Sequence, residues 1–327
     1  MIRISIIVCC YNSASRLQQT LKHLAKLGTE AVNCELIIVD NNSTDNTKDL
    51  SLTIWNNLKN RYPLKVVEER NPGLSHARKA GVKSATGEII VFCDDDNWLN
   101  PNYLNNVVEI FNKMPEVGII GGTGIEIIEH KQPRWFNQIK GRYAVGTSLE
   151  SSQYVSNVYG AGMAIRKAIL NKIETSLFNS QLHGRKGKSL SGGEDTEICF
   201  AAAILGYKIY WSIENTFFHF IPQSRLTYSY LIRLFKGSAH THANINGLRY
   251  LATGEKSALL KSILVSDVKW LLKLPKSVLF KGQLHWHLLW LLHKIEYWRI
   301  VVLNYRNIKK SYAHNYWFND QQNKENH

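Results

Sequence analysis

The sequence predicts an α/β protein with a Rossmann-like domain followed by a helical C-terminal region. Short runs of β-branched residues alternate with segments of helical periodicity, which is typical of a parallel sheet with helices on both faces. The 327 residues, 44% of them hydrophobic, suffice to bury a large core. We therefore expect an α/β domain over residues 1–230 and a basic, Trp-rich helical region over residues 231–327.

The predicted elements follow one another regularly over the first 121 residues. We expect strands at 2–9, 35–39, 64–68, 88–93 and 117–121, separated by helices at about 14–27, 45–60, 74–85 and 101–113. From about 130 to 193 the periodicity fades into a stretch rich in Gly, Ser and aromatic residues, which favours an irregular, substrate-facing region. A helix at about 195–205 and a strand at 207–212 follow.

The N-terminal run MIRISIIVCCYN has some likeness to a signal peptide, but it is short, β-branched and lacks a small-residue cleavage site. We interpret it as a buried first strand. The five cysteines form an odd set without CxxC spacing, which fits a reducing environment. We therefore expect a cytoplasmic protein.

The net charge of +14 is concentrated at the C-terminal end, where residues 231–327 hold 15 Lys and Arg against 5 Asp and Glu. This excess lies among Trp, Leu and Ile residues, which suits an anionic membrane surface better than nucleic acid. Segments 257–274 and 277–303 fit helices lying in a membrane interface, and they equally fit a helical pair packed against protein. We expect peripheral binding to the inner face of the cytoplasmic membrane and no nucleic-acid partner.

Three consecutive carboxylates, Asp94, Asp95 and Asp96, directly follow the predicted strand at 88–93. Burying such a cluster without a cation is costly, and Mg²⁺ or Mn²⁺ favours carboxylates combined with phosphate oxygens. A solvated turn that caps the next helix explains the same residues without a metal. The pattern alone leaves both interpretations open.

Polar residues also follow other predicted strands. Tyr11 and Asn12 follow the first strand, Asp40 ends the second, and Arg78 lies in the helix after NPG. Ligands of open α/β sheets bind beyond the carboxyl ends of the strands, so these side chains are candidates for a nucleotide site. Helix capping and an ordinary basic helix surface are the alternatives.

The motif GGEDTE places Glu194 and Asp195 at the start of a helix, after two glycines. Glycine lets a backbone approach a ligand, and a helix N-terminus favours a negative charge, so a general base is one interpretation. An N-terminal cap is the other.

Over roughly residues 3–235 the chain resembles the inverting family 2 glycosyltransferases of the GT-A fold, because six motifs occur in the expected order: CCYN, DNNSTDNT, NPGLSHARKAG, GEIIVFCDDDN, GAGMAIRK and GGEDTE. The resemblance implies a nucleotide-diphospho-sugar transferase domain, with a nucleotide-binding half at 1–125 and an acceptor-binding half at 126–230. It also implies a metal cofactor, Mn²⁺ or Mg²⁺.

The resemblance assigns a role to each candidate site residue. The residues expected to bind the donor are Tyr11, Asn12, Asp40, Arg78, Asp94 and Asp95. The residues expected to bind the metal are Asp96, Asp94 and His219. Asp195 is expected to act as the base, with Glu194 beside it. We expect a nucleotide-sugar donor, most simply a UDP-sugar, and a saccharide or lipid-linked acceptor of polysaccharide or glycolipid biosynthesis. The basic loop at 183–188 fits either a lid over the diphosphate or a solvated charge run.

The sequence lacks the motifs that are typical of two other functions and disfavours a third. A nicotinamide dehydrogenase would carry GxGxxG after the first strand, and this chain does not. A nucleotidyltransferase usually has a Gly-rich, basic phosphate loop at that point, where this chain has CCYNSAS. A nucleotide-sugar-binding protein without catalytic activity would not need both DDD and GGED.

Overall fold

The computed structural model describes residues 2–28, 32–59, 62–175, 180, 182, 184, 185, 190–253 and 286–303. The chain divides into two compact units, of which the first comprises Met1–Thr175 and Glu194–Thr227 and the second Ser176–Gly193 and Tyr228–His327. The predicted helix at 257–274, the start of the segment at 277–303 and most of the basic loop at 183–188 lie outside the described residues.

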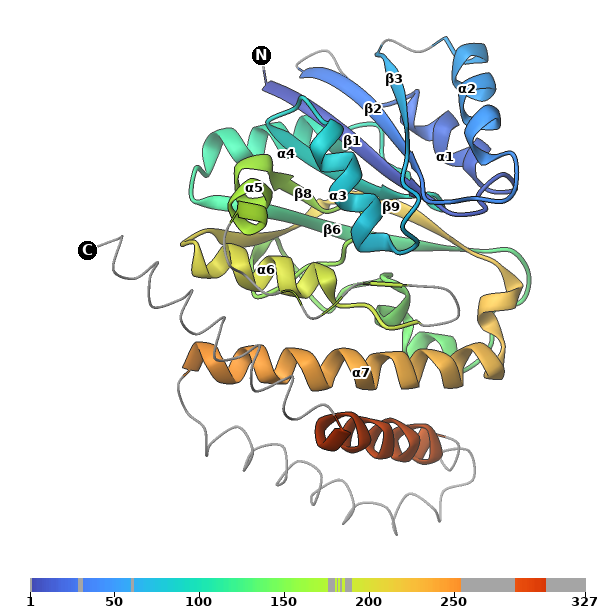
Figure 1. The fold of residues 1–327 in the computed structure, drawn as a ribbon, viewed down its shortest axis with the longest axis vertical. Coiled ribbons are helices and arrows are strands. Elements are labelled where there is room, and N and C mark those ends of the chain that lie inside the picture. The colour runs from blue at the N-terminus through green and yellow to red at the C-terminus, as the bar shows by residue number, and fades with distance from the viewer. Residues whose placement is uncertain are drawn as a thin grey trace. The chain divides into compact units, whose positions relative to one another are not determined.

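The first unit is built on one mixed β-sheet (Figure 1). In the described part of the chain its strand order is β3-β2-β1-β4-β8-β6-β9-β5, with β7 paired to β9. The strands are β1 (Ile2–Cys10), β2 (Val32–Asp40), β3 (Leu64–Glu68), β4 (Ile89–Asp94), β5 (Asn97–Leu99), β6 (Val117–Ile128), β7 (Gln153–Val155), β8 (Ala164–Arg166) and β9 (Lys208–Ile221).

Helices cover both faces of this sheet and form two hydrophobic clusters. One cluster takes side chains from α1, α2 and α4, and the other from α3, α5 and α6. The helices are α1 (Leu17–Leu24), α2 (Thr47–Asn57), α3 (Leu74–Ser84), α4 (Tyr103–Lys113), α5 (Lys167–Thr175) and α6 (Glu194–Ile204), with short 3₁₀ turns η1 (Phe136–Gln138), η2 (Lys140–Tyr143) and η3 (Gln223–Leu226). The expected α/β architecture is confirmed.

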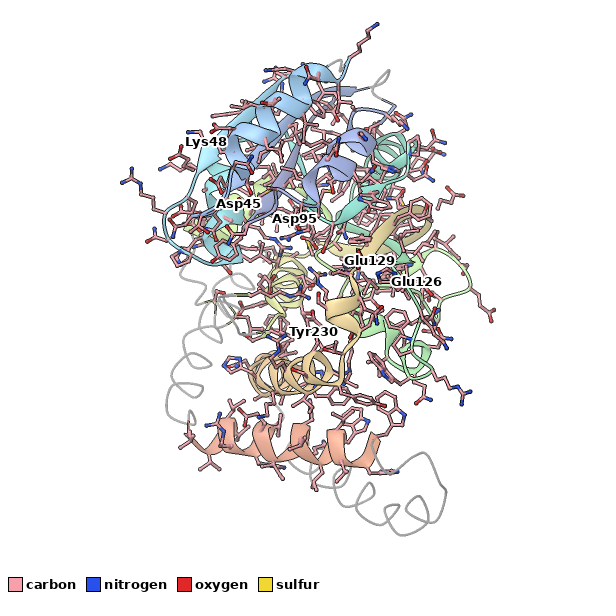
Figure 2. The ribbon with its side chains drawn as sticks, turned by 90° about the vertical axis from the view of Figure 1, so that its right-hand side faces the viewer. Asp45, Lys48, Asp95, Glu126, Glu129 and Tyr230 are labelled. Carbon is pink, nitrogen blue, oxygen red and sulfur yellow. The ribbon has the colours of Figure 1, made fainter. Side chains whose placement is uncertain are left out.

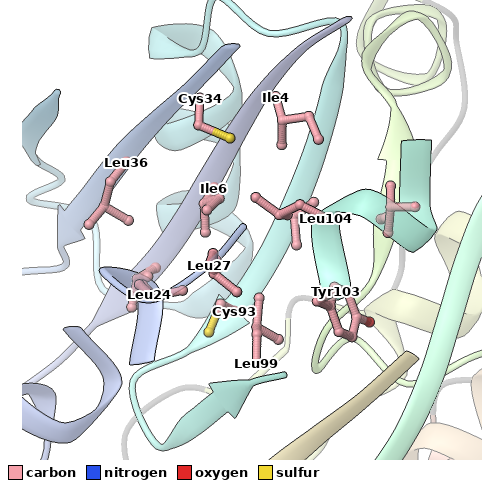
Figure 3. Packing of buried hydrophobic residues seen from close by; sticks show 14 of the residues in the cluster. Ile4, Ile6, Leu24, Leu27, Cys34, Leu36, Cys93, Leu99, Tyr103 and Leu104 are labelled. Carbon is pink, nitrogen blue, oxygen red and sulfur yellow. The ribbon is translucent and has the colours of Figure 1, made fainter. Parts of the chain in front are cut away.

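The centre of the sheet is apolar on both faces because successive side chains of a strand point to opposite sides. In β1, Ile4 and Ile6 point into the cluster under α1, whereas Ile7 points into the cluster under α3, and all three are fully buried. Figure 3 shows Ile4 and Ile6 packing with Leu24 and Leu36. This rigid core fixes the ends of β1, β2 and β4.

Three features differ from the sequence expectation. The sheet is not all parallel, because β8 lies antiparallel between β4 and β6. The region expected to be irregular, 130–193, contains β7, β8 and α5. The short strand β5 was not expected, and it pairs antiparallel with β9, which extends well beyond the predicted end at 212.

The second unit contains the long helix α7 (Tyr228–Thr253) and a helix over 286–303. The two pack against each other: Phe235 meets Trp290 edge to face, and Nδ1 of His242 lies 3.1 Å from Nε2 of His293. The described residues contain no helix long and apolar enough to cross a membrane.

Candidate functional site

The polar clusters predicted at three strand ends do converge on one edge of the sheet. In the strand register, Cys10 at the end of β1 pairs with Asp40 of β2, and Cys9 pairs with Asp94 of β4. The residues that follow these strands are therefore neighbours. The prediction that they share one edge is confirmed.

The loops after β1 and β2 are joined by direct hydrogen bonds. Asn12, in the left-handed conformation with φ 49°, donates its N–H to Oγ of Ser43 at 3.0 Å, and its Oδ1 accepts the N–H of Thr44 at 2.8 Å. Asp40 accepts the N–H of Ser43 at 3.2 Å. Tyr11, beside Asn12, is 54% exposed. Asn12 and Asp40 thus shape the loop pair, and the Tyr11 side chain beside it is exposed to solvent.

Asp95 is held by a buried polar network. Its carboxylate accepts a hydrogen bond from Oγ of Ser13 and lies 2.7 Å from Nη2 of Arg16. The N–H of Ser13 donates to Thr47, which in turn bonds Asp45, so the labelled Asp45 and Asp95 of Figure 2 belong to one chain of contacts. Burial raises the pKa of the Asp95 carboxyl, the charge of Asp96 adds to this, and Arg16 and Ser13 oppose it.

Asp96 is brought to β9 by the unexpected strand β5. The N–H of Phe220 donates to the carbonyl of Asp96 at 2.9 Å, and Asn97 pairs with His219. As a result Nε2 of His219 lies 3.6 Å from one carboxylate oxygen of Asp96, and Nη1 of Arg225 lies 2.8 Å from the other. The Asp96 side chain is 4% exposed.

A divalent metal fits the donor atoms found here. No hydrogen bond or ion pair engages the half-buried Asp94 carboxylate within the described part of the chain. Asp96 and His219 add oxygen and nitrogen donors close to each other. Among the residues described, no group of three or more His, Cys, Asp or Glu is arranged to hold a metal. Mg²⁺ characteristically combines one or two carboxylates with substrate phosphates, and Mn²⁺ takes the same kinds of donor, which matches this partial site.

Arg78, which the family resemblance assigns to the donor, is buried in α3. Its Nη1 is 3.2 Å from Oε1 of Glu194, and its guanidinium lies over the ring of Phe92. A Cβ at Gly160 would lie 2.6 Å from Nη2 of Arg78, so the guanidinium packs directly against this glycine. Burial acts to lower the pKa of Arg78, but the carboxylates of Glu194, Asp94 and others outweigh it and raise the pKa. The buried guanidinium stays charged.

Asp195 lies in the first turn of α6 and is fixed by two backbone groups. Its Oδ2 accepts the N–H of Gly160 at 2.8 Å, and its Oδ1 accepts the N–H of Thr196 at 2.7 Å. The side chain is half buried. Oδ1 also accepts the hydroxyl of Thr196 at 3.5 Å. These contacts orient the carboxylate, and Oδ2 retains a lone pair for a further hydrogen bond.

The thiol of Cys9, near the end of β1, is unreactive at neutral pH. Burial raises the pKa of the Cys9 thiol to about 12, and the neighbouring carboxylates Asp94 and Asp95 add to the increase while Arg78 opposes it. A thiol with this pKa carries almost no thiolate at neutral pH, so Cys9 is not a nucleophile.

Sequence reasoning missed three polar residues of the site: Ser13, Arg16 and Arg225. Ser13 and Arg16 follow Asn12 in the same loop, and their nearness to the strand end was a usable signal. Arg225 lies six residues after His219 in the run FFHFIPQSR. Nothing local in the sequence pairs it with Asp96, because that contact depends on the pairing of β5 with β9.

Comparison with known proteins identifies a family. The family described as Glycosyl transferase family 2 matches residues 5–174, more than half of the chain. The glucosyl-dolichyl phosphate glucuronosyltransferase of Haloferax volcanii is 20% identical over 202 residues, which are 60% of this chain and 63% of that protein. Two further curated relatives are 31% identical, and the chain spans about a third of their length.

Solved structures share the fold. The mannosyltransferase PcManGT from Pyrobaculum calidifontis, in complex with GDP-Man and Mn²⁺, superposes with a TM-score of 0.58 at 18% identity, covering 92% of this chain and 87% of that one. The structure of residues 1–349 of S. aureus TarS, in complex with UDP-GlcNAc, superposes with a TM-score of 0.50 at 20% identity, covering 73% of this chain and 66% of that one. The GT-A fold expected from the motifs is confirmed.

Proposed function

This chain belongs to glycosyl transferase family 2, and on that premise we propose that it is an inverting glycosyltransferase, which moves a sugar from a nucleotide-diphosphate sugar to an acceptor hydroxyl. The observation that carries the proposal is the position of Arg78: its guanidinium lies over the ring of Phe92 in β4, two residues before Asp94, and pairs with Glu194, the neighbour of Asp195. The two carboxylates assigned to the donor and to the base therefore lie around one buried cation.

The donor nucleotide binds at the ends of β1 and β2. The exposed ring of Tyr11 stacks on the base, while Asp40 accepts hydrogen bonds from the base or ribose and Asn12 holds the loop in shape. Asp94, open at the end of β4, accepts a ribose hydroxyl or joins the metal. A UDP-sugar is the donor we expect. The complexes of TarS with UDP-GlcNAc and of PcManGT with GDP-Man support a nucleotide sugar as the donor class.

Asp96, with Asp94 and His219, would hold Mn²⁺ or Mg²⁺, which when bound supplies positive charge to the departing diphosphate. Arg16 and Arg225, each paired with a buried carboxylate, place two more cations at the same edge. The Mn²⁺ in the PcManGT complex supports a metal of this kind.

Asp195 accepts the proton of the acceptor hydroxyl. Its two backbone hydrogen bonds hold the carboxylate in one orientation, which is what a general base requires. The hydroxyl oxygen attacks the anomeric carbon on the side opposite the nucleoside diphosphate, so the anomeric configuration inverts. Glu194 contributes indirectly, by neutralising Arg78.

The acceptor is a saccharide or a lipid-linked sugar, and the enzyme binds the inner face of the cytoplasmic membrane peripherally. The helix over 286–303 supports this, because its exposed aliphatic side chains recur at helical spacing and form one face: Leu288, Leu291, Leu292, Ile295, Val302 and Leu303. This face belongs to residues 231–327, which carry most of the net positive charge of the chain, so we expect it to bind anionic lipid. The glucosyl-dolichyl phosphate in the name of the Haloferax relative supports a lipid-linked acceptor.

A thermal-shift panel tests the donor proposal. UDP- and GDP-sugars are added with and without Mn²⁺, and a ligand that binds only the folded state raises the unfolding midpoint. We expect at least one nucleotide sugar to raise it, more strongly with Mn²⁺. The absence of a shift with every nucleotide sugar would contradict the proposed donor class.

A further inference from the structure

Arg225 occupies one side of the carboxylate that the proposed function gives to the metal. Its Nη1 lies 2.8 Å from Oδ2 of Asp96, and the same Nη1 lies 3.5 Å from Nε2 of His219. A guanidinium therefore lies among the very atoms that would coordinate a divalent cation. The Asp96 side chain is only 4% exposed, whereas that of Arg225 is 21% exposed.

The backbone of Arg225 is fixed while its side chain reaches inward. Arg225 lies in η3, directly after β9, and its N–H donates to the carbonyl of Pro222 at 2.9 Å. The hydroxyl of Tyr143 donates to the carbonyl of Arg225 at 2.9 Å. The long side chain can thus change its partner by rotating about its own bonds, without any movement of the strand.

Electrostatics explains why an arginine pairs with Asp96. A buried carboxylate needs a compensating charge, and Arg225 supplies it to Asp96 as Arg16 does to Asp95. A divalent cation that bound Asp96 would replace this compensation and repel the guanidinium. The guanidinium then needs a new anionic partner, and a diphosphate offers a bidentate one.

We propose that Arg225 competes with the metal for Asp96 in the ligand-free protein and transfers to the donor diphosphate when metal and donor bind together. Arg225 is then the residue that couples metal binding to donor binding. Metal alone binds weakly because it must displace Arg225, and the nucleoside diphosphate removes this penalty. This inference rests on the proposed function, because it takes the donor to be a nucleoside diphosphate sugar.

Calorimetric titration of Mn²⁺ into the full-length protein, with and without saturating UDP, tests the coupling. Wild type should bind Mn²⁺ weakly on its own and at least about tenfold more tightly in the presence of UDP. This ratio is expected if Arg225 occupies Asp96 in about nine molecules out of ten. Arg225→Met should bind Mn²⁺ alone about tenfold more tightly than wild type and should lose most of the UDP effect. Arg134→Met, which removes an exposed arginine from the same unit, should match wild type.

Two results would overturn the inference: a folded Arg225→Met protein that binds Mn²⁺ alone with wild-type affinity, or one that keeps the full UDP effect. Arg225→Gln, which removes the charge and keeps a polar side chain, replaces the Met variant if that variant does not fold; the same results are expected of it, and the same two results would overturn the inference. If wild type binds neither UDP nor GDP even with Mn²⁺, the proposed function fails instead, so the two failures are distinguishable.

Discussion

The guanidinium of Arg78 and the carboxylate of Glu194 form a buried ion pair, with Nη1 and Oε1 3.2 Å apart and side chains only 8% and 11% exposed. The pair joins α3, which follows the donor loops, to the first turn of α6, which carries Asp195. We infer that it holds the base in position relative to the sheet.

Arg78→Met should lower the free energy of unfolding by about 3–5 kcal/mol, because it leaves the buried Glu194 carboxylate without its arginine. The double variant Arg78→Met with Glu194→Gln should lose less than the sum of the two single changes. Urea denaturation measures all three. Lys79→Met is the matched control, because Lys79 pairs with Glu174 on the surface and its loss should cost less than about 1 kcal/mol. Equal losses for Arg78 and Lys79 would contradict the structural role.

Asp195→Asn should reduce turnover by about 10²–10⁴-fold while leaving donor binding unchanged, because the amide keeps the hydrogen bond from Gly160 but accepts no proton. The donor dissociation constant is measured by titration and turnover by release of the nucleoside diphosphate in the presence of acceptor. If donor affinity falls as far as turnover, Asp195 is a binding residue and the base must be sought elsewhere.

Leu292→Gln combined with Ile295→Gln should reduce binding to vesicles rich in anionic lipid, because two aliphatic side chains would no longer enter the membrane interface. Flotation at low and high salt measures the binding, which salt should weaken. Leu52→Gln, at an exposed leucine of α2, controls for the loss of surface hydrophobicity. If wild type does not float, or if the double variant floats equally well, this helix face does not bind lipid.

The sequence predicted the first half of the sheet well because each strand there is a continuous apolar run bounded by polar turns. It also placed Tyr11, Asp40 and Asp94 at one edge, since parallel strands end together. Such patterns are local, and a single sequence displays them directly.

The second half could not be read in the same way. Strand β5 has three residues, too few to show alternation, and β8 is equally short within a stretch without periodicity. The partners of Asp96 depend on the pairing of β5 with β9, a contact between segments far apart in the sequence. For this reason His219 was assigned through family resemblance, and Arg225 was not assigned at all.

Metal-assisted transfer through Asp96 is tested by the release of nucleoside diphosphate from a nucleotide sugar, measured with Mn²⁺ and with EDTA for wild type and Asp96→Asn. We expect release by wild type with Mn²⁺, loss of release in EDTA, and little release by the Asn variant under either condition, with its folding verified by thermal denaturation. Asp49→Asn, which changes an exposed carboxylate on α2, should behave as wild type. Full activity of wild type in EDTA, or of Asp96→Asn with Mn²⁺, would contradict a metal-assisted transfer through Asp96.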